Sequence, residues 1–175
     1  KFKLFSLKLN INYKSYFKDS TFFSSISYDF LGGLHPLTII RFKLINIFER
    51  MGFSILYGPE IESDWNNFTG LNFPKEHSAR DMQDTFFVEK KNKLLLRTHT
   101  SSVQIRSMEK KKIPIKSISI GKVFRKESIS SRTHCIFHQL EGFYINRNVN
   151  FVNLKTILVC FINEIFGKNV KVRFR

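Results

Sequence analysis

Two short segments in the second half of the chain, residues 121–127 and 137–142, restrict its possible fold more than any other part of the sequence. Chemically distinctive side chains recur at every second position in both: Arg125 and Glu127 in the first segment, and Phe137, Gln139 and Glu141 in the second. Because successive side chains of a β-strand point to opposite faces of its sheet, each set can lie on one face. The pattern therefore predicts two antiparallel strands that share a polar face, with Val123, Leu140 and Tyr144 or their neighbours packing elsewhere.

The shared face carries groups that suit a nucleotide and a small charged molecule. The guanidinium of Arg125 can clamp a phosphate or a carboxylate through two parallel hydrogen bonds. Adenine can stack on Phe137, which is worth roughly 1–3 kcal/mol for one base. The two glutamates could hold an ammonium group, Gln139 could donate to a carbonyl, and Arg132 and His134 in the intervening loop can reach toward further phosphates. The alternative is the solvated face of an ordinary hairpin.

The charge of the chain narrows the class of partner. Its 29 Lys and Arg residues against 14 Asp and Glu residues give a net charge of +15 at pH 7, and residues 91–175 hold 18 of these bases but only 4 of the acids. A field of this size favours polyanions such as RNA or nucleotide phosphates, or an acidic partner surface. The alternative is that lysines accumulated on solvated faces through codon bias.

Length, apolar runs and cysteines indicate one domain in a reducing compartment. A chain of 175 residues is long enough for one sizeable core and too short to predict two domains. No apolar run approaches the roughly 18 residues that span a bilayer, so we expect a soluble, cytoplasmic protein, with an organelle that has its own translation as the less favoured location. Cys135 and Cys160 have neither the number nor the spacing of a disulfide framework or a zinc site. We expect Cys135 to be a buried thiol rather than a nucleophile.

Periodicity and turn signals predict helices interspersed with short strands. Apolar residues at three- and four-residue steps indicate helices, the last of them with Phe151 at the start of its apolar stripe. Pro36 and Asn150 suit the starts of two of these helices. The expected helices are residues 36–51, 101–110 and 151–166, and the expected strands are 53–57, 85–89, 93–98, 114–127 and 170–173, with an irregular stretch over 60–84. Strands that arrive as hairpins with helices between them indicate an α+β fold in which helices flank an antiparallel β-sheet.

The first 34 residues differ from the rest. They are rich in Lys, Ser, Asn and Phe, and only a weak alternation over residues 7–11 suggests a strand. Gly32 and Gly33 form a natural joint. We therefore predict an N-terminal extension over residues 1–34 and a domain over residues 35–175.

The motif Gly-Lys-Val-Phe-Arg-Lys-Glu at residues 121–127, followed by His134 and by Phe-His-Gln-Leu-Glu-Gly at 137–142, resembles motif 2 of class II aminoacyl-tRNA synthetases. Its form is that of the phenylalanyl-tRNA synthetase α subunits. Further stretches resemble the same family in order: 35–37 and 52–62 (motif 1), 67–86, 96–106 and 171–175. Together these matches cover residues 35–175 almost without a gap.

This resemblance implies a role for each predicted site residue. Arg125 would bind the α-phosphate of ATP, Phe137 would stack on adenine, and His134, with Arg132, would lie near the outer phosphates. The groups expected around the ammonium and carboxylate of the amino acid are His99, Ser101, Gln104, Glu127, Gln139 and Glu141. Within this set Arg125, Glu127 and His134 are the residues expected to act in catalysis. Pro59 would belong to a subunit interface, and no residue is predicted as a metal ligand.

The resemblance also implies the reaction and its participants. The expected activity is ATP-dependent activation of phenylalanine and its transfer to the 3′ end of tRNA(Phe), with Mg²⁺ as the cation and a β subunit as partner in an α2β2 assembly. Motif 3 is missing after residue 175, and residues 1–34 are shorter than the family's helical arm. We therefore expect the first part of a catalytic domain, truncated before motif 3. The alternative is a catalytically inactive fragment that serves as a subunit- or tRNA-binding module.

Overall fold

The computed structural model describes residues 5–9, 33–80, 84–89, 91, 93–110 and 113–174. Most of the predicted extension over residues 1–34 therefore lies outside the described residues. The helices of the described part are α1 (Pro36–Arg50), α2 (Asp64–Asn67), α3 (Ser102–Lys110) and α4 (Phe151–Phe166), with short 3-10 helices η3 (Thr69–Leu71) and η4 (Ser78–Arg80). None of these helices is long and apolar enough to cross a membrane.

Two sheets organise the described residues. The larger has the strand order β1-β7-β6-β2, and the smaller has the order β3-β5-β4. Their bounds are β1 Phe5–Leu9, β2 Ser54–Leu56, β3 Ile61–Ser63, β4 Phe87–Glu89, β5 Leu94–Leu96, β6 Ile115–Phe124 and β7 Ile136–Ile145. All pairs are antiparallel except β2 with β6, which run parallel. The predicted hairpin of two long strands is confirmed by β6 and β7, and β1 extends the same sheet on the far side of β7.

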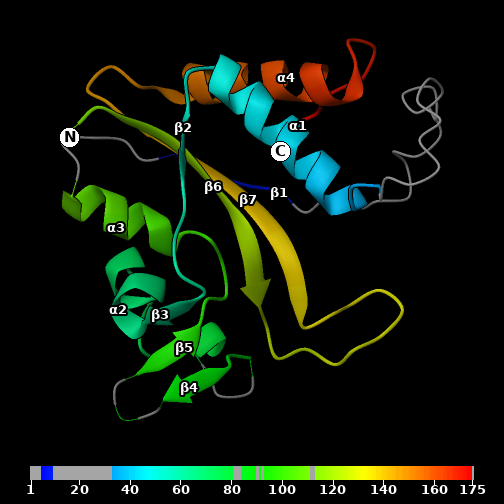
Figure 1. The fold of residues 1–175 in the computed structure, drawn as a ribbon. Helices are drawn as coiled ribbons and strands as arrows, with labels where there is room; N and C mark the ends of the chain where they lie inside the picture. The colour runs from blue at the N-terminus through cyan, green and yellow to red at the C-terminus, as the bar shows by residue number, and fades with distance from the viewer. Residues whose placement is uncertain are drawn as a thin grey trace.

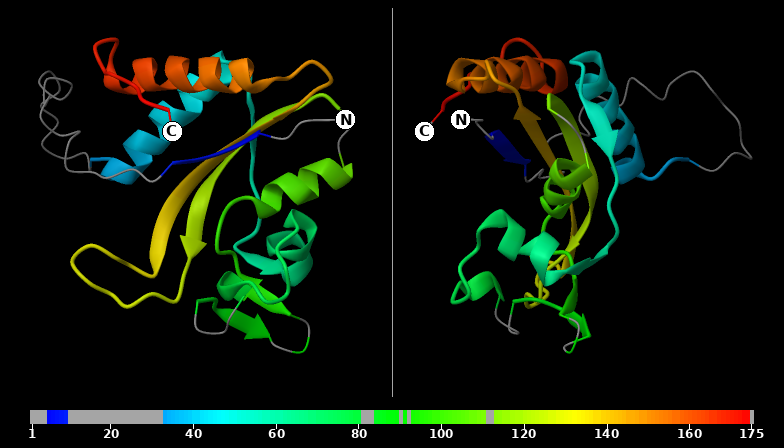
Figure 2. Two further views of the ribbon diagram at one scale, coloured as in Figure 1. Left: turned by 180° about the vertical axis from the view of Figure 1, so that it is seen from behind. Right: turned by 90° about the vertical axis from the view of Figure 1, so that its left-hand side faces the viewer.

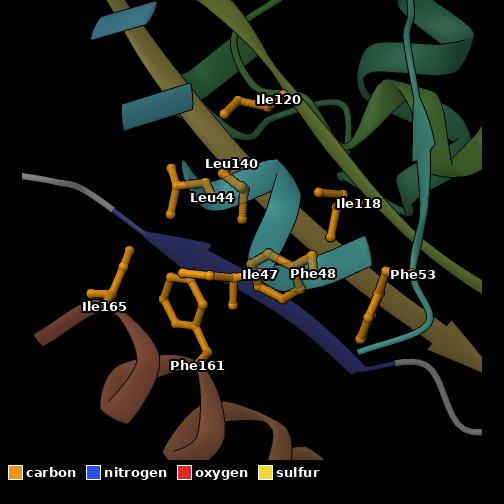
Figure 3. Packing of buried hydrophobic residues seen from close by; sticks show 9 residues of the cluster. All are labelled: Leu44, Ile47, Phe48, Phe53, Ile118, Ile120, Leu140, Phe161 and Ile165. Atoms are coloured by element: carbon orange, nitrogen blue, oxygen red, sulfur yellow. The ribbon is translucent and has the colours of Figure 1, made fainter. Parts of the chain in front are cut away.

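One face of the large sheet packs against α1 and α4. Figure 1 shows these two helices side by side across one end of the β6–β7 hairpin, away from α2, α3 and the small sheet. The buried core on this face consists of Leu44, Ile47, Phe48, Phe53, Ile118, Ile120, Leu140, Phe161 and Ile165 (Figure 3). The ring of Phe48 stacks on Phe161 at 4.9 Å between centroids and meets Phe53 edge-on at 5.2 Å. This cluster fixes the even-numbered residues of β6 and β7 toward the helices.

Local sequence explains where both long helices begin and end. At the start of α1 the ring of His35 accepts a hydrogen bond from the N–H of Leu37 (3.1 Å), and Pro36 occupies the first helical position. Gly52 follows the helix with φ of +79°, a conformation that favours glycine. At the start of α4, Asn150 and Asn153 form a reciprocal capping box.

The structure departs from the sequence prediction in three places. The stretch over 60–84 is not wholly irregular, because it contains β3, α2 and two 3-10 helices. Residues 170–173 are not in a strand. Phe151, expected on the apolar stripe of α4, is 63% exposed.

A fourth difference concerns Val123. It pairs with Phe137 across β6 and β7 and is completely buried. Paired residues of neighbouring strands share a face, so Val123 lies on the polar face rather than elsewhere. Leu140, by contrast, belongs to the core beneath the helices, as predicted.

Candidate functional site

The candidate site lies on the face of β6 and β7 that is turned away from α1. Odd-numbered residues of both strands occupy this face, since Ile118, Ile120 and Leu140, at even-numbered positions, belong to the helix-packed core. Residues 97–101, which we call the strap, connect β5 to α3 and lie over this face. Figure 2 shows α3 and α1 on different sides of the hairpin.

A buried carboxylate forms one end of the site. Glu141 on β7 is 1% exposed and accepts hydrogen bonds from the hydroxyl of Ser101 and from the amide of Gln104 (Nε2 to Oε2, 3.2 Å). Ser101 precedes α3 and Gln104 lies in its first turn, so the start of this helix is tied to the sheet. A buried carboxylate is suited to a cationic ligand group.

Gln139, one pleat along β7, attaches the strap to the same face. Its side-chain oxygen accepts from the backbone N–H of Thr100 at 3.3 Å, and Gln139 is 3% exposed. The structure therefore brings together four of the six residues predicted to surround the amino acid: Ser101, Gln104, Gln139 and Glu141.

An arginine and an aromatic ring form the other end. The backbone N–H of Arg125 donates to the carbonyl of Cys135 (2.9 Å), so strand-like pairing continues past the last residue of β6. The guanidinium lies over the ring of Phe137, 5.0 Å from its centroid, and Arg125 Nε donates to the carbonyl of Thr98 at 3.4 Å. Arg125 and Phe137 thus present a cation and a flat ring side by side, as the alternation predicts.

His99 is held in an aromatic cluster. The residue is 4% exposed, and its ring stacks on Phe73 with 5.9 Å between centroids and 15° between planes. Phe68 meets the same ring edge-on at 6.4 Å. The strap residue His99 therefore packs its ring against Phe68 and Phe73, and its assignment to the amino-acid site stays a prediction.

Three predicted residues lie in the loop between β6 and β7. Glu127, Arg132 and His134 are all exposed. The ring of His134 accepts from the backbone N–H of Ile136 at 3.0 Å, a local turn contact. In the described part of the chain, no side-chain contact joins these three residues to the cluster at Glu141, so their roles also stay predictions.

Sequence analysis did not identify Arg97 as part of this site. Arg97 is 4% exposed, and its guanidinium donates to the backbone carbonyls of Lys122 (2.7 Å) and Gly58 (3.0 Å). Burial lowers the pKa of Arg97, an effect that Glu60 and Glu62 oppose. A side chain on Gly121 would come within 2.1 Å of this guanidinium, so the glycine of the motif was the signal for it.

A second feature that the sequence did not predict is an ion pair between β3 and α3. Glu62 on β3 is 1% exposed, and Arg106 Nη2 binds its carboxylate at 2.6 Å. This hydrogen-bonded pairing raises the pKa of Arg106. Asn66 donates to the same carboxylate at 3.1 Å. The contact between β3 and α3 holds the helix that carries Gln104.

The opposite side of the sheet carries a groove of about 270 Å³. Its lining combines apolar residues such as Leu37 and Ile40 with the charged side chains of Arg41, Glu60 and Lys122. His138 lies in the same groove, and its pKa is lowered by burial and by the nearby Lys122 and Arg41. None of the predicted site side chains other than Gln139 lines this groove.

The residues that the structure describes do not form a metal site by themselves. No group of three or more His, Cys, Asp or Glu side chains among them could hold a metal ion. Mg²⁺ prefers near-octahedral oxygen ligands, often one or two carboxylates completed by phosphates and water. The donor set on the polar face does not fit a dedicated protein cage for this ion.

The matched family accounts for this arrangement. Residues 21–175 match the family model described as tRNA synthetases class II core domain (F). The chain belongs to this family. The expected class II fold, with helices flanking a largely antiparallel sheet, is thereby confirmed.

The curated relatives of this chain indicate a narrower group within the class II family. The chain is 57% identical to phenylalanine–tRNA ligase alpha subunits of Cytophaga hutchinsonii and Flavobacterium johnsoniae and 55% identical to that of Bacteroides fragilis strain YCH46, over 145 residues in each case. The matches cover 83% of this chain but 42–43% of each relative. The chain thus spans about two fifths of the length of the curated relatives it matches. The resemblance to phenylalanyl-tRNA synthetase α subunits is confirmed.

Solved structures of other class II synthetases share the fold. Pyrrolysyl-tRNA synthetase from Desulfitobacterium hafniense superposes with a TM-score of 0.60 at 17% identity, covering 74% of this chain and 47% of that one. A second structure of the enzyme from this organism gives 0.59 at 18%. At sequence identities this low, the similarity shows only that the folds are alike.

Proposed function

We propose that this chain is part of a phenylalanine–tRNA ligase α subunit and binds ATP and phenylalanine on the polar face of β6 and β7. The observation that carries the proposal is the placement of two complementary ends on one face. At one end the carboxylate of Glu141 is buried beneath Ser101 and Gln104, and at the other the guanidinium of Arg125 lies over the ring of Phe137. Relatives that are 57% identical to this chain carry the name of this ligase.

The ATP end of the proposed site uses charge and stacking. Arg125 binds the α-phosphate, and Phe137 stacks on adenine. His134 and Arg132, which extend from the exposed loop, bind the outer phosphates when ATP is present. The loop is joined to the ends of both strands, so it can approach the phosphates without rearranging the sheet.

The amino-acid end uses buried polar groups. Glu141 and Glu127 attract the ammonium. Ser101 and Gln104 orient the carboxylate of Glu141, and Gln139 holds the strap beside it. His99 closes this end through its aromatic packing. The amino-acid carboxylate then attacks the α-phosphorus, which yields aminoacyl-adenylate and pyrophosphate. A hydroxyl at the tRNA 3′ end subsequently attacks the carbonyl of the adenylate and accepts the aminoacyl group, with release of AMP and a proton.

Positioning and charge neutralisation account for the catalytic effect in this proposal. Two anions, a carboxylate and a phosphate, must be brought together, and Arg125 offsets their repulsion at the reacting centre. Because the described residues do not form a cage for Mg²⁺, we assign the ion no step. ATP is the substrate that the class II family membership implies.

The proposed partners follow from the subunit name and from charge. An α subunit implies a β subunit, and we place both with tRNA(Phe) in a cytoplasmic α2β2 assembly. The excess of bases over residues 91–175, 18 against 4 acids, would attract the phosphates of tRNA.

Pyrophosphate exchange tests the activity. The full-length protein that carries these residues is assayed for phenylalanine-dependent ATP–pyrophosphate exchange with and without the β subunit. We expect exchange in the presence of the β subunit, and we expect its loss in Arg125→Ala but not in Arg50→Ala, which removes an exposed arginine of α1. Absence of exchange under both conditions would contradict the proposal and favour an inactive binding module.

A further inference from the structure

The strap is attached to β6 and β7 or to the residue that follows β6 at four of its five residues. The attachments are Arg97 O with Phe124 N (2.9 Å), Thr98 O with Arg125 Nε (3.4 Å), Thr100 N with Gln139 Oε1 (3.3 Å), and Ser101 Oγ with Glu141. The position of the strap therefore decides how the two ends of the proposed site are spaced. A group that fixes the strap from its other side would control both ends.

Asn67 is such a group. It is the last residue of α2, it is completely buried, and its side-chain amide binds Thr98 twice. Asn67 Nδ2 donates to the hydroxyl of Thr98 at 3.0 Å, and Asn67 Oδ1 accepts from the backbone N–H of Thr98 at 3.3 Å. Two hydrogen bonds from one planar amide fix both the place and the rotation of the residue that they hold.

The carbonyl of Thr98 is also the acceptor for Arg125 Nε. Asn67, Thr98 and Arg125 thus form a continuous chain of contacts from the fully buried end of α2 to the guanidinium over Phe137. Asn67 holds the N–H and the hydroxyl of Thr98, so it also fixes the place of the Thr98 carbonyl that Arg125 contacts.

We propose that Asn67 is a positioning residue for ATP binding, which acts through Thr98 on Arg125. The proposal rests on the function proposed above, and Asn67 itself touches neither substrate. Removing its amide frees Thr98 to shift, and its carbonyl shifts with it, so that Arg125 loses its fixed direction toward the phosphate. A displacement of a positioning group by an ångström can cost on the order of a hundredfold in rate.

Asn66 provides the matched control. It precedes Asn67 in α2, is 8% exposed, and donates to Glu62 rather than to the strap. Asn66→Ala and Asn67→Ala therefore both remove a buried amide from the same helix, but only the second releases Thr98. A purely structural role for Asn67 predicts that the two variants behave alike.

The test is a double-mutant cycle on ATP binding in the full-length protein with its β subunit. We expect Asn67→Ala to weaken the Kd for ATP about tenfold when Arg125 is present and less than about twofold in the Arg125→Ala background, since coupled residues are not additive. Asn67→Asp keeps the shape and can accept from both the N–H and the hydroxyl of Thr98, so it should recover most of the affinity. Equal factors in both backgrounds, or an equal loss in Asn66→Ala, would overturn the proposal.

A second measurement needs no activity. Solvent exchange of the Arg125 Nε–H, followed by NMR, should quicken in Asn67→Ala and stay unchanged in Asn66→Ala. No change in Asn67→Ala would refute the inferred chain of contacts. If the unmutated protein neither bound ATP nor exchanged pyrophosphate, the proposed function would fail; binding with additive mutants would refute only the role of Asn67.

Discussion

Glu141 accepts a hydrogen bond from the hydroxyl of Ser101, a residue 40 positions earlier in the chain. Both are buried, with 1% and 6% of their surfaces exposed. The contact ties β7 to the turn before α3, so the carboxylate is positioned by two elements at once. In the proposed site, the ammonium of the amino acid is the ligand group that complements this buried carboxylate.

Glu141→Gln should weaken phenylalanine binding more than ATP binding. The substitution keeps the shape and a hydrogen-bonding oxygen but removes the negative charge. A hydrogen bond to a charged group contributes about 1.5–3 kcal/mol, which corresponds to a rise of roughly tenfold to a hundredfold in the KM for phenylalanine. Steady-state pyrophosphate exchange with each substrate varied in turn measures this difference.

Ser101→Ala is the matched control for that prediction. It removes one donor to Glu141 and leaves the charge, so its effect on the KM for phenylalanine should be smaller. Equal increases in the KM values for phenylalanine and ATP in Glu141→Gln would show that the carboxylate supports the site as a whole rather than the ammonium.

Arg106→Ala should destabilise the fold through Glu62. The carboxylate of Glu62 is completely buried, and its ion pair with Arg106 has an N–O distance of 2.6 Å. Removing one partner of a buried pair leaves the other charge without compensation and costs about 3 kcal/mol. Urea denaturation followed by circular dichroism measures the change in the free energy of unfolding.

The exposed ion pair of Arg50 with Glu164 gives the comparison. Its side chains are 62% and 47% exposed, although the contact distance of 2.7 Å is nearly the same. Arg50→Ala should therefore cost less than about 1 kcal/mol. If the two variants lost equal stability, burial would not be the reason for the importance of Glu62.

The polar face was predictable because a strand has a period of two. The same arithmetic shows why the expectation for Val123 was wrong: Val123 and Arg125 are two positions apart, so they must share a face. The face of a residue follows from its parity, but its burial depends on what covers it. Here the strap covers the middle of the polar face, and the loop between β6 and β7 leaves the end of that face open.

Contacts between distant segments gave no periodic signal in the sequence. Asn67 and Thr98 are 31 positions apart, and Glu62 and Arg106 are 44 apart. Their elements, α2 and β3, have four and three residues, too few to establish a helical or strand period. These contacts of Asn67 and Glu62 could therefore be found only in the structure. The site residues on the long strands could be predicted from the sequence.

Gly121→Ala should disturb Arg97. A Cβ at position 121 would lie 2.1 Å from Arg97 Nη2, and the guanidinium cannot move away without giving up backbone carbonyls that it binds. Overpacking of this kind costs about 1–3 kcal/mol. Gly33→Ala is the control, because nothing lies within 4 Å of the added carbon. Thermal unfolding of both variants measures the difference. A melting temperature of Gly121→Ala equal to that of the unmutated protein would contradict the expectation.

His138 should make stability depend on pH in the mildly acidic range. Burial lowers its pKa below 6.5, with further lowering by Lys122 and Arg41 and partial opposition from Glu60. The folded protein therefore binds this proton less readily than the unfolded chain, and stability falls as the pH drops from about 7 through the folded pKa.

The corresponding variant isolates the contribution of this histidine. His138→Gln cannot take up the proton, so its free energy of unfolding should fall less between about pH 7.5 and about pH 5.5 than that of the unmutated protein. NMR titration of the ring gives the pKa directly, and Lys122→Ala should raise it because one nearby positive charge is removed. A titration midpoint at or above 6.5 in the unmutated protein would refute the explanation, since the folded state would then hold the proton at least as tightly as the unfolded chain.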